Sequence, residues 1–316
     1  MRRRQNEKAT PVNQPDANEL LLEELLHTLD CQWSPLPDKP EETAHHSLRA
    51  LWHRARGHAR SVEHAKQAEL PVLELEDFQR LRHLIDQRHA GVPLAHLTER
   101  QHFLGLELEV GPAALVPRKE TEILAAAALQ LLHQIVQQRG AALVLDVCAG
   151  SGNLATVLAH YESRCRVCVA DLSPAAVQLA RRNAQRHQLD GRVRFFEGDL
   201  FGPFALEEFS RAFDLIICNP PYISSGKVEA LPPETGRHEP RLAFDGGAFG
   251  LDVISRLIAE APRHLRPDSW LCFELGNGQG DYLARHLGKN PAYTEVRRLV
   301  DQQGQIRALA ARTRPE

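Results

Sequence analysis

The chain has 316 residues, of which 43% are hydrophobic and 25% are charged, and its formal net charge at pH 7 is −3. This composition is ordinary for a soluble globular protein and leaves room for two domains. It excludes a strong overall attraction to nucleic acid or anionic lipid, and the most apolar run, residues 123–132, is too short to cross a bilayer.

The first 16 residues carry charges, but no apolar stretch follows them. They therefore do not resemble a signal peptide, and they predict a disordered tail. The six cysteines are scattered or lie in apolar runs, as in a reduced intracellular protein. We expect a cytoplasmic protein without a membrane partner.

Apolar residues recur at helical spacing in three stretches of the first hundred residues, and Asp16 is placed to cap the first of them. These stretches, 17–30, 44–55 and 77–88, predict a helical domain over residues 17–98. The alternating run "FLGLELEV" follows and predicts a strand or hairpin within residues 99–119.

Strands and helices alternate from residue 120 to the end of the chain, which predicts an α/β fold with a doubly wound, mostly parallel sheet. The last two strands are joined by a short link and are expected to pair antiparallel as a closing hairpin. The predicted helices are 120–138, 153–161, 174–188, 249–263 and 278–288. The predicted strands are 142–147, 166–170, 193–197, 213–218, 269–275, 293–298 and 305–310.

The stretch "LVLDVCAGSGNLA" begins as a strand and ends as a helix, and ligands bind beyond the carboxyl ends of such strands. Gly150 and Gly152 allow the backbone to approach a ligand closely. Asp146, at the strand end, can accept from a ligand amine or fix the loop, and Asp171, after the next strand, can accept from both ribose hydroxyls of an adenosine. Asp199 either faces adenine or caps its own turn. The pattern fits NAD as well as S-adenosylmethionine.

The fourth strand of this domain ends abruptly in Asn219-Pro220-Pro221-Tyr222, within "DLIICNPPYISS". It lies next to the switch point of a doubly wound sheet, so its end opens onto the same crevice as the glycine loop. The Asn219 side-chain oxygen and the Pro220 carbonyl form two acceptors that match the two hydrogens of a planar amino group. Tyr222 offers a face for stacking. A rigid turn without a ligand is the plain structural alternative.

Methyl transfer explains why two acceptors are needed there. In an amide the nitrogen lone pair is delocalised, so the nitrogen is a poor nucleophile and must be oriented toward the methyl carbon. Holding reactants in such a geometry supplies roughly 7–11 kcal/mol. An NAD enzyme has no use for this pair of acceptors, so the tetrapeptide favours S-adenosylmethionine.

No metal site is expected. Cys165 and Cys168 lie on one predicted strand and point to opposite faces, so they share neither a metal nor a disulfide. None of the 16 histidines lies three or four residues from another, the usual spacing of ligands on a helix.

Six stretches resemble, in the same order, the motifs of the protein-glutamine N5-methyltransferases: "LVLDVCAGSGNLA", "VADLSPAAVQLARRNA", "EGDLFG", "CNPPYI", "HEPRLAFDGG" and "FELGNGQG". The segments "GVPLAHLTERQHFLGLELEV" and "ALVPRKETEIL" resemble the family's hinge before its catalytic domain. The resemblance implies a Rossmann-like, seven-stranded class I methyltransferase domain over residues 120–316. It also implies a small N-terminal helical domain that helps to select the protein substrate.

This resemblance implies methylation of a glutamine amide in a protein, most often in the Gly-Gly-Gln motif of peptide-chain release factors, with S-adenosylmethionine as donor. A sister branch acts on a glutamine of ribosomal protein L3, and Cys148 resembles that branch, whereas "PRKETE" resembles the release-factor branch. Phe103 and Glu122 are expected to line the cleft, and Asn219, Pro220, Pro221 and Tyr222 to hold the target amide. The implied donor contacts are Asp146, Cys148, Ala149, Gly150, Ser151, Gly152, Asp171, Asp199, Leu200 and Asn219.

Two other classes of function stay open from the residues alone. The tetrapeptide would also serve the exocyclic amine of a nucleobase, extruded from its stack, or the amine of a small molecule. Duplex DNA is disfavoured as a partner, because the charge is balanced and no basic stripe is present. A non-catalytic binding module on the translation machinery is the third hypothesis.

Overall fold

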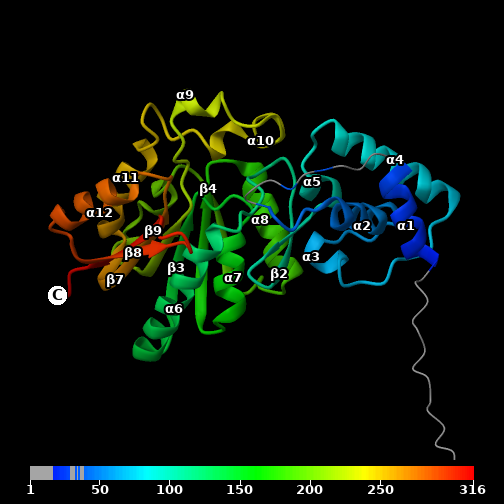
Figure 1. Cartoon of the computed structure of the whole chain (residues 1–316). Coiled ribbons are helices and arrows are strands. Elements are labelled where there is room, and N and C mark those ends of the chain that lie inside the picture. Colours follow the sequence, from blue (N-terminus) through cyan, green and yellow to red (C-terminus); the bar gives the residue numbers. More distant parts are fainter. Residues whose placement is uncertain (1–16, 29–32, 34, 36–38) are drawn as a thin grey trace, which may run out of the picture.

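The computed structural model describes residues 17–28, 33, 35 and 39–316. The predicted tail and the Asp16 cap lie outside the described residues. Figure 1 shows a group of helices from the N-terminal part of the chain beside a larger region built around a sheet, with two short helices, α9 (Ser225–Val228) and α10 (Pro233–His238), above them.

The N-terminal helices pack around a core of their own. Leu48, Trp52 and Leu81 are among its fully buried members, and the Trp52 indole donates a hydrogen bond of 2.8 Å to the Pro71 carbonyl. All three helices predicted in this region are confirmed. The helices are α1 (Ala17–Thr28), α2 (Ala44–Ala55), α3 (Val62–Ala65), α4 (Leu75–His89) and α5 (Leu94–Thr98).

A two-stranded hairpin links the helical region to the sheet. Strands β1 (Arg100–Phe103) and β2 (Leu106–Glu109) pair antiparallel. Leu104 and Gly105 between them have φ of 43° and 83°, which is the backbone of a tight two-residue hairpin turn. The alternating sequence pattern is therefore confirmed as a hairpin. Helix α6 (Thr121–Arg139) follows and ends at Gly140, as predicted.

The sheet has seven strands in the order β5-β4-β3-β6-β7-β9-β8. It is parallel except for β9, which pairs antiparallel with both β7 and β8. The predicted doubly wound sheet with a closing hairpin is thus confirmed. The strands are β3 (Ala142–Val147), β4 (Cys165–Asp171), β5 (Val193–Glu197), β6 (Phe213–Cys218), β7 (Leu265–Glu274), β8 (Tyr293–Val300) and β9 (Ile306–Thr313).

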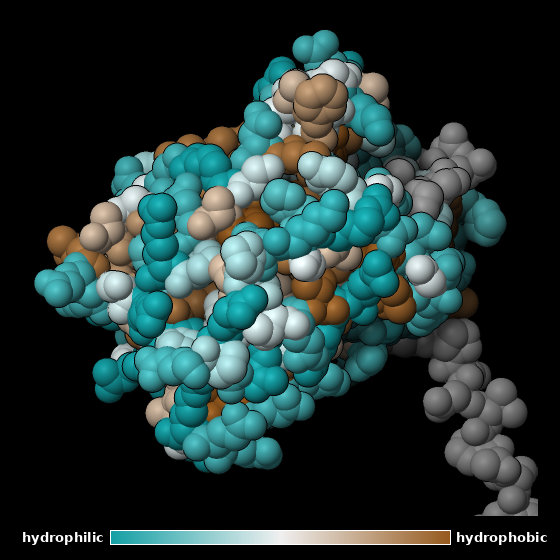
Figure 2. All heavy atoms as spheres, turned by 90° about the vertical axis from the view of Figure 1, so that its left-hand side faces the viewer, coloured by the Kyte–Doolittle hydropathy of each residue, from teal (hydrophilic) through white to brown (hydrophobic). Residues whose placement is uncertain are grey.

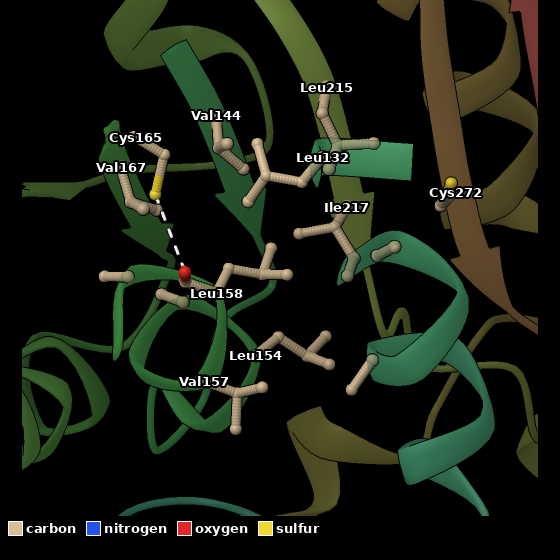
Figure 3. Packing of buried hydrophobic residues seen from close by; sticks show 14 of the residues in the cluster. Leu132, Val144, Leu154, Val157, Leu158, Cys165, Val167, Leu215, Ile217 and Cys272 are labelled. Atoms are coloured by element: carbon tan, nitrogen blue, oxygen red, sulfur yellow. Dashed lines mark hydrogen bonds between the residues drawn. The ribbon is translucent and has the colours of Figure 1, made fainter. Parts of the chain in front are cut away.

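Helices cover both faces of the sheet, because successive strand residues point to opposite sides. Figure 3 shows one face, where Val144 and Ile217 of the sheet meet Leu154 and Leu158, both from a helix that follows β3. Helices α6, α7 (Asn153–Tyr161) and α8 (Pro174–Arg186) lie on this face, and α11 (Asp252–Glu260) and α12 (Gly280–Lys289) lie on the other.

The two cysteines of the C-x-x-C sequence belong to different faces. Cys165 joins the core cluster that contains α7, and Cys168 joins the cluster that contains α11. The prediction that they point apart is confirmed, and the reason is the two-residue period of strand β4.

Strand β7 begins at Leu265, earlier than the predicted start at residue 269. Its pairing with β6 shifts register after Leu265 and resumes at Trp270. Asp268, within this irregular stretch, has a φ of 59°. The polar Arg-Pro-Asp sequence is therefore accommodated by an irregularity in the ladder rather than by a loop before the strand.

Hydrophilic side chains dominate the molecular face in Figure 2, with apolar atoms visible between them. In the described part of the chain, no helix combines the length and the apolar character that crossing a membrane requires.

Candidate functional site

A pocket of about 160 Å³ lies at the carboxyl ends of the parallel strands. The loops after β3, β4, β5 and β6 converge there because parallel strands place these ends at one edge of the sheet. Two further segments complete the walls, residues 113–121 before and at the start of α6, and residues 240–243 after α10. The predicted site residues that line the pocket are Cys148, Ala149, Gly150, Ser151, Asp171, Asp199, Leu200, Asn219 and Pro221.

The glycine loop joins β3 to α7 in a tightly folded backbone. Cys148, Gly150 and Gly152 have φ of 55°, 54° and 71°. Gly152 is the residue before α7 and packs so closely on α8 that an added Cβ would lie 2.7 Å from the Ala180 Cβ. Glycine at this position thus permits both the left-handed backbone conformation and the close packing of the loop against α8.

We expect Gly152→Ala to destabilise the fold more than Gly140→Ala does. Both positions have positive φ, and the left-handed conformation of Gly152 costs an alanine about 1–2 kcal/mol. Only Gly152 adds a clash, because nothing lies within 4 Å of a Cβ built on Gly140. Overpacking of this kind costs about 1–3 kcal/mol more. Urea unfolding measures both variants, and equal losses would contradict the predicted contact.

Asp171 connects the second strand of the domain to the glycine loop. Its Oδ2 accepts from the Gly150 N–H and its Oδ1 accepts from the Ser173 N–H, both at 2.8 Å. Burial raises the pKa of the Asp171 carboxyl, and these two N–H donors partly oppose the rise. Each oxygen retains a lone pair, so the carboxylate can accept from further donors in the pocket.

Asp199 and Leu200 form the wall after β5. The Asp199 carboxylate is more than half exposed and pairs with Arg256, whose Nη1 lies 3.0 Å from Oδ2. Leu200 is buried with a φ of 46°. This wall therefore offers one apolar side chain and one solvated carboxylate.

Asp146 is sealed beneath the loop and does not line the pocket. Its Oδ2 accepts from the Ala155 N–H at 3.0 Å, which ties the end of β3 to the first turn of α7. Burial raises the pKa of this carboxyl to about 8. Of the two roles considered for Asp146, fixing the loop is the one that these contacts support.

The tetrapeptide after β6 splits between the pocket and the core. Asn219 and Pro221 line the pocket, and the Asn219 Nδ2 donates to the Thr121 Oγ1 at 3.3 Å. Pro220 is buried. Tyr222 packs against the core cluster beside α11, and its hydroxyl donates to Glu274 Oε1 at 3.0 Å.

Glu274 is a buried carboxylate at the carboxyl end of β7. Burial raises its pKa to about 6, against the lowering effects of the Thr121 and Tyr222 hydroxyls and of Arg307. The pKa of the Tyr222 phenol is raised by burial and by the neighbouring Glu274. The phenol is therefore neutral and donates its proton to the carboxylate.

The segment after Tyr222 covers the pocket, and Pro240, Leu242 and Ala243 form part of its wall. The carboxylate of Glu239 anchors it by accepting from the Val116 N–H at 2.8 Å and from the Arg118 guanidinium at 2.5 Å.

The same segment is tied to the N-terminal helices. Glu234 of α10 pairs with Lys39 at 3.3 Å and with Arg88 of α4 at 2.9 Å. The cover thus contacts the two regions of the molecule, in agreement with the position of α10 in Figure 1.

Phe103 and Glu122 lie outside the pocket. Phe103 is fully buried in the core. Glu122 accepts from the Leu104 N–H at 2.8 Å and lines a separate polar cavity with His102 and Lys119.

Sequence reasoning did not assign Thr121 and Glu274. Both stand within stretches that carried the resemblance, "ALVPRKETEIL" and "FELGNGQG". Glu274 ends a strand of the parallel part of the sheet, and a carboxylate at that place is a signal that could have identified it.

The groups that line the pocket fit an adenosyl ligand. Asp171 supplies a carboxylate with free lone pairs, Leu200 an apolar contact, and the glycine loop a backbone that a ligand can approach closely. Asn219 faces the same space, so its side chain can meet a substrate beside that ligand.

Comparison with known proteins places the chain among methyltransferases. A family model described as "Methyltransferase small domain" matches residues 124–231. A release factor glutamine methyltransferase of Geobacter sulfurreducens is 41% identical over 209 residues, which cover 66% of this chain and 69% of that protein. One from Thermosynechococcus vestitus is 34% identical over 295 residues, 84% of this chain and 98% of that protein. A ribosomal protein uL3 glutamine methyltransferase of Bradyrhizobium diazoefficiens is 39% identical over 208 residues, 62% of each chain.

Proposed function

The chain belongs to the family of release factor and ribosomal protein uL3 glutamine methyltransferases, and we propose that it methylates a glutamine in a peptide-chain release factor. The methyl group goes from S-adenosylmethionine to the side-chain amide nitrogen (N5) of the Gly-Gly-Gln glutamine. The observation that carries this proposal is the shared pocket of Asn219 and the Gly150 loop. Family membership favours a protein glutamine over the nucleobase and small-molecule alternatives.

S-adenosylmethionine, when bound, supplies a methyl group on a positively charged sulfur. The residues of this chain would bind this methyl donor and orient the target amide. Asp171 and the loop Cys148–Gly152 hold the adenosyl part, with Asp199 and Leu200 beside it. The Asn219 Oδ1 and the Pro220 carbonyl accept the two hydrogens of the target amide, and Pro221 stiffens the turn that carries them. This orientation directs the amide nitrogen toward the methyl carbon.

One release factor relative also aligns with the N-terminal region of this chain. The alignment with the Thermosynechococcus enzyme covers more of this chain than residues 120–316 contain, so it extends into the N-terminal region. The alignment with the uL3 enzyme covers 62% of each chain. Another release factor relative, from Geobacter sulfurreducens, covers 66% of this chain, close to the uL3 enzyme, so it is the longer alignment that favours a release factor as the substrate.

Incubation with isotope-labelled S-adenosylmethionine and a purified release factor, followed by mass spectrometry, tests the proposal. We expect one labelled methyl group on the Gly-Gly-Gln peptide and none on a release factor whose motif glutamine is replaced by alanine. Ribosomal protein uL3 is the second candidate, favoured by Cys148 in the glycine loop. Label on uL3 with none on the release factor would reassign the substrate, and label on neither would contradict the proposed reaction.

A further inference from the structure

A short line of polar side chains connects Asn219 to a buried carboxylate. The Asn219 Nδ2 donates to the Thr121 Oγ1 at 3.3 Å, and the Thr121 hydroxyl lies beside the Glu274 carboxylate, whose pKa it lowers. The Tyr222 hydroxyl donates to Oε1 of the same carboxylate at 3.0 Å. Glu274 Oε2 is buried and has no hydrogen-bond partner among the described residues. Thr121 and Glu274 are only 1% and 2% exposed, so water does not compete for these bonds.

The chemistry of these groups fixes the direction of the hydrogen bonds. An ionised carboxylate only accepts, and the buried Oε2 lacks a donor, so the single hydroxyl hydrogen of the neighbouring Thr121 is attracted toward Glu274. The Thr121 oxygen is then left to accept from Asn219. The Asn219 amide must therefore present its NH2 to Thr121, which leaves Oδ1 for the pocket. An amide turned by 180° would place two oxygens against each other at Thr121 and an NH2 group toward the substrate.

We propose that Glu274 and Thr121 are positioning residues, which hold the Asn219 amide with its oxygen toward the substrate. The inference rests on the proposed function, because it assigns Asn219 Oδ1 as an acceptor for the target amide. A purely structural role accounts less well for the arrangement, since a buried carboxylate costs free energy that an apolar residue would not. The positioning role explains why that carboxylate lies behind the tetrapeptide.

The charge state of Glu274 controls this direction. The groups that face it are Thr121 and Glu120 at the start of α6, Tyr222 after β6, and Arg307 of β9. Its pKa of about 6 leaves the carboxyl ionised at neutral pH. Protonated Glu274 can donate to Thr121, whose hydroxyl is then free to donate to Asn219 Oδ1, and the amide can turn. The competent orientation is thus present above about pH 6 and lost below it.

The first test compares Thr121→Val with Thr121→Ser, since valine keeps the shape without the hydroxyl and serine keeps the hydroxyl. We expect Thr121→Val to lower kcat for release factor methylation by about 10- to 100-fold, because misplacement of a substrate-holding group has an effect of this size. Thr121→Ser stays within about threefold of the wild type by the same reasoning. Calorimetry should give similar donor affinity for all three proteins. Wild-type kcat in Thr121→Val, or equal losses in both variants, would overturn the proposal.

The second test uses the pH profile of kcat. The wild type and Thr121→Ser should lose activity as the pH falls through about 6. Glu274→Gln should have a low kcat without this acid limb, because its side chain no longer titrates. If the loss of activity at acid pH persists unchanged in Glu274→Gln, a group other than Glu274 titrates, and the proposed role of the Glu274 charge is wrong.

A readout without substrate separates this inference from the proposed function. The two side-chain NH2 resonances of Asn219 are identified by their absence from the NMR spectrum of Asn219→Ala. In the wild type they should shift with pH, with a midpoint near 6, and in Thr121→Val they should not. If the wild type methylates no release factor but shows this titration, the substrate assignment fails and the positioning network stands. If methylation occurs without the titration, the network fails and the function stands.

Discussion

Asn219→Ala should lower the turnover of release factor methylation by about 10²- to 10³-fold, an effect comparable to the loss of one well-placed hydrogen-bonding group in an active site. The variant removes the acceptor that orients the target amide, while the pocket walls formed by the glycine loop and Asp171 stay in place. Donor affinity, measured by calorimetry, should therefore remain within a few fold of the wild type. The loss should appear in kcat, because the hydrogen bond from the target amide to Asn219 is most important in the transition state, when the nitrogen attacks.

Asn290→Ala is a suitable control for this result. Asn290 also uses its side-chain oxygen, which accepts from the Ala292 N–H at 3.0 Å, but it does not line the pocket. We expect normal turnover from it. Full activity in Asn219→Ala would show that the amide of the substrate is held elsewhere, and a large loss of donor affinity would show that Asn219 mainly serves the donor.

Asp171→Ala should weaken donor binding by about 100-fold or more, because two hydrogen bonds to a charged acceptor are lost and each contributes about 1.5–3 kcal/mol. The carboxylate lines the pocket, and its two oxygens already hold the Gly150 and Ser173 N–H groups in place. The variant thus removes both the proposed ribose acceptor and a support of the loop. Calorimetry with S-adenosylmethionine measures the total loss.

A ligand without ribose hydroxyls separates the two roles of Asp171. The wild type should bind S-adenosylhomocysteine far more tightly than its 2′,3′-dideoxy analogue, whereas Asp171→Ala should bind both with similar, weak affinity. If Asp171→Ala keeps the full preference for the hydroxylated ligand, the carboxylate supports the loop and does not contact the ribose.

The strand assignments could be read from the sequence because their cause is local. Strands β3, β5 and β6 begin and end at the predicted residues. Strands β3 and β6 are short apolar runs buried on both faces, whereas β5 is an edge strand whose side chains are partly exposed. Strand β7 differs at its start, because Arg-Pro-Asp has the composition of a loop, and pairing with β6 on both sides of this stretch, at Leu265 and from Trp270, includes it in the strand.

The candidate pocket could be anticipated for a related reason. The order of strands and helices predicts a parallel sheet, and a parallel sheet brings the ends of its strands to one edge. The glycine loop, Asp171 and Asn219 all follow parallel strands and are therefore expected around one space, and the structure brings them together. Strand order does not determine side-chain directions, and Asp146, which also lies at the end of a strand, is sealed below the loop.

The sequence by itself determined the fold class, the glycine loop and the abrupt Asn-Pro-Pro-Tyr corner, because backbone preference and apolar period act between near neighbours. Only the tertiary structure decided that Tyr222 turns toward Glu274 and that Asn219 meets Thr121. Those partners are 52 and 98 residues apart in the chain. Hydrogen bonds between such distant residues depend on how the layers pack, and no local pattern in the sequence records that packing.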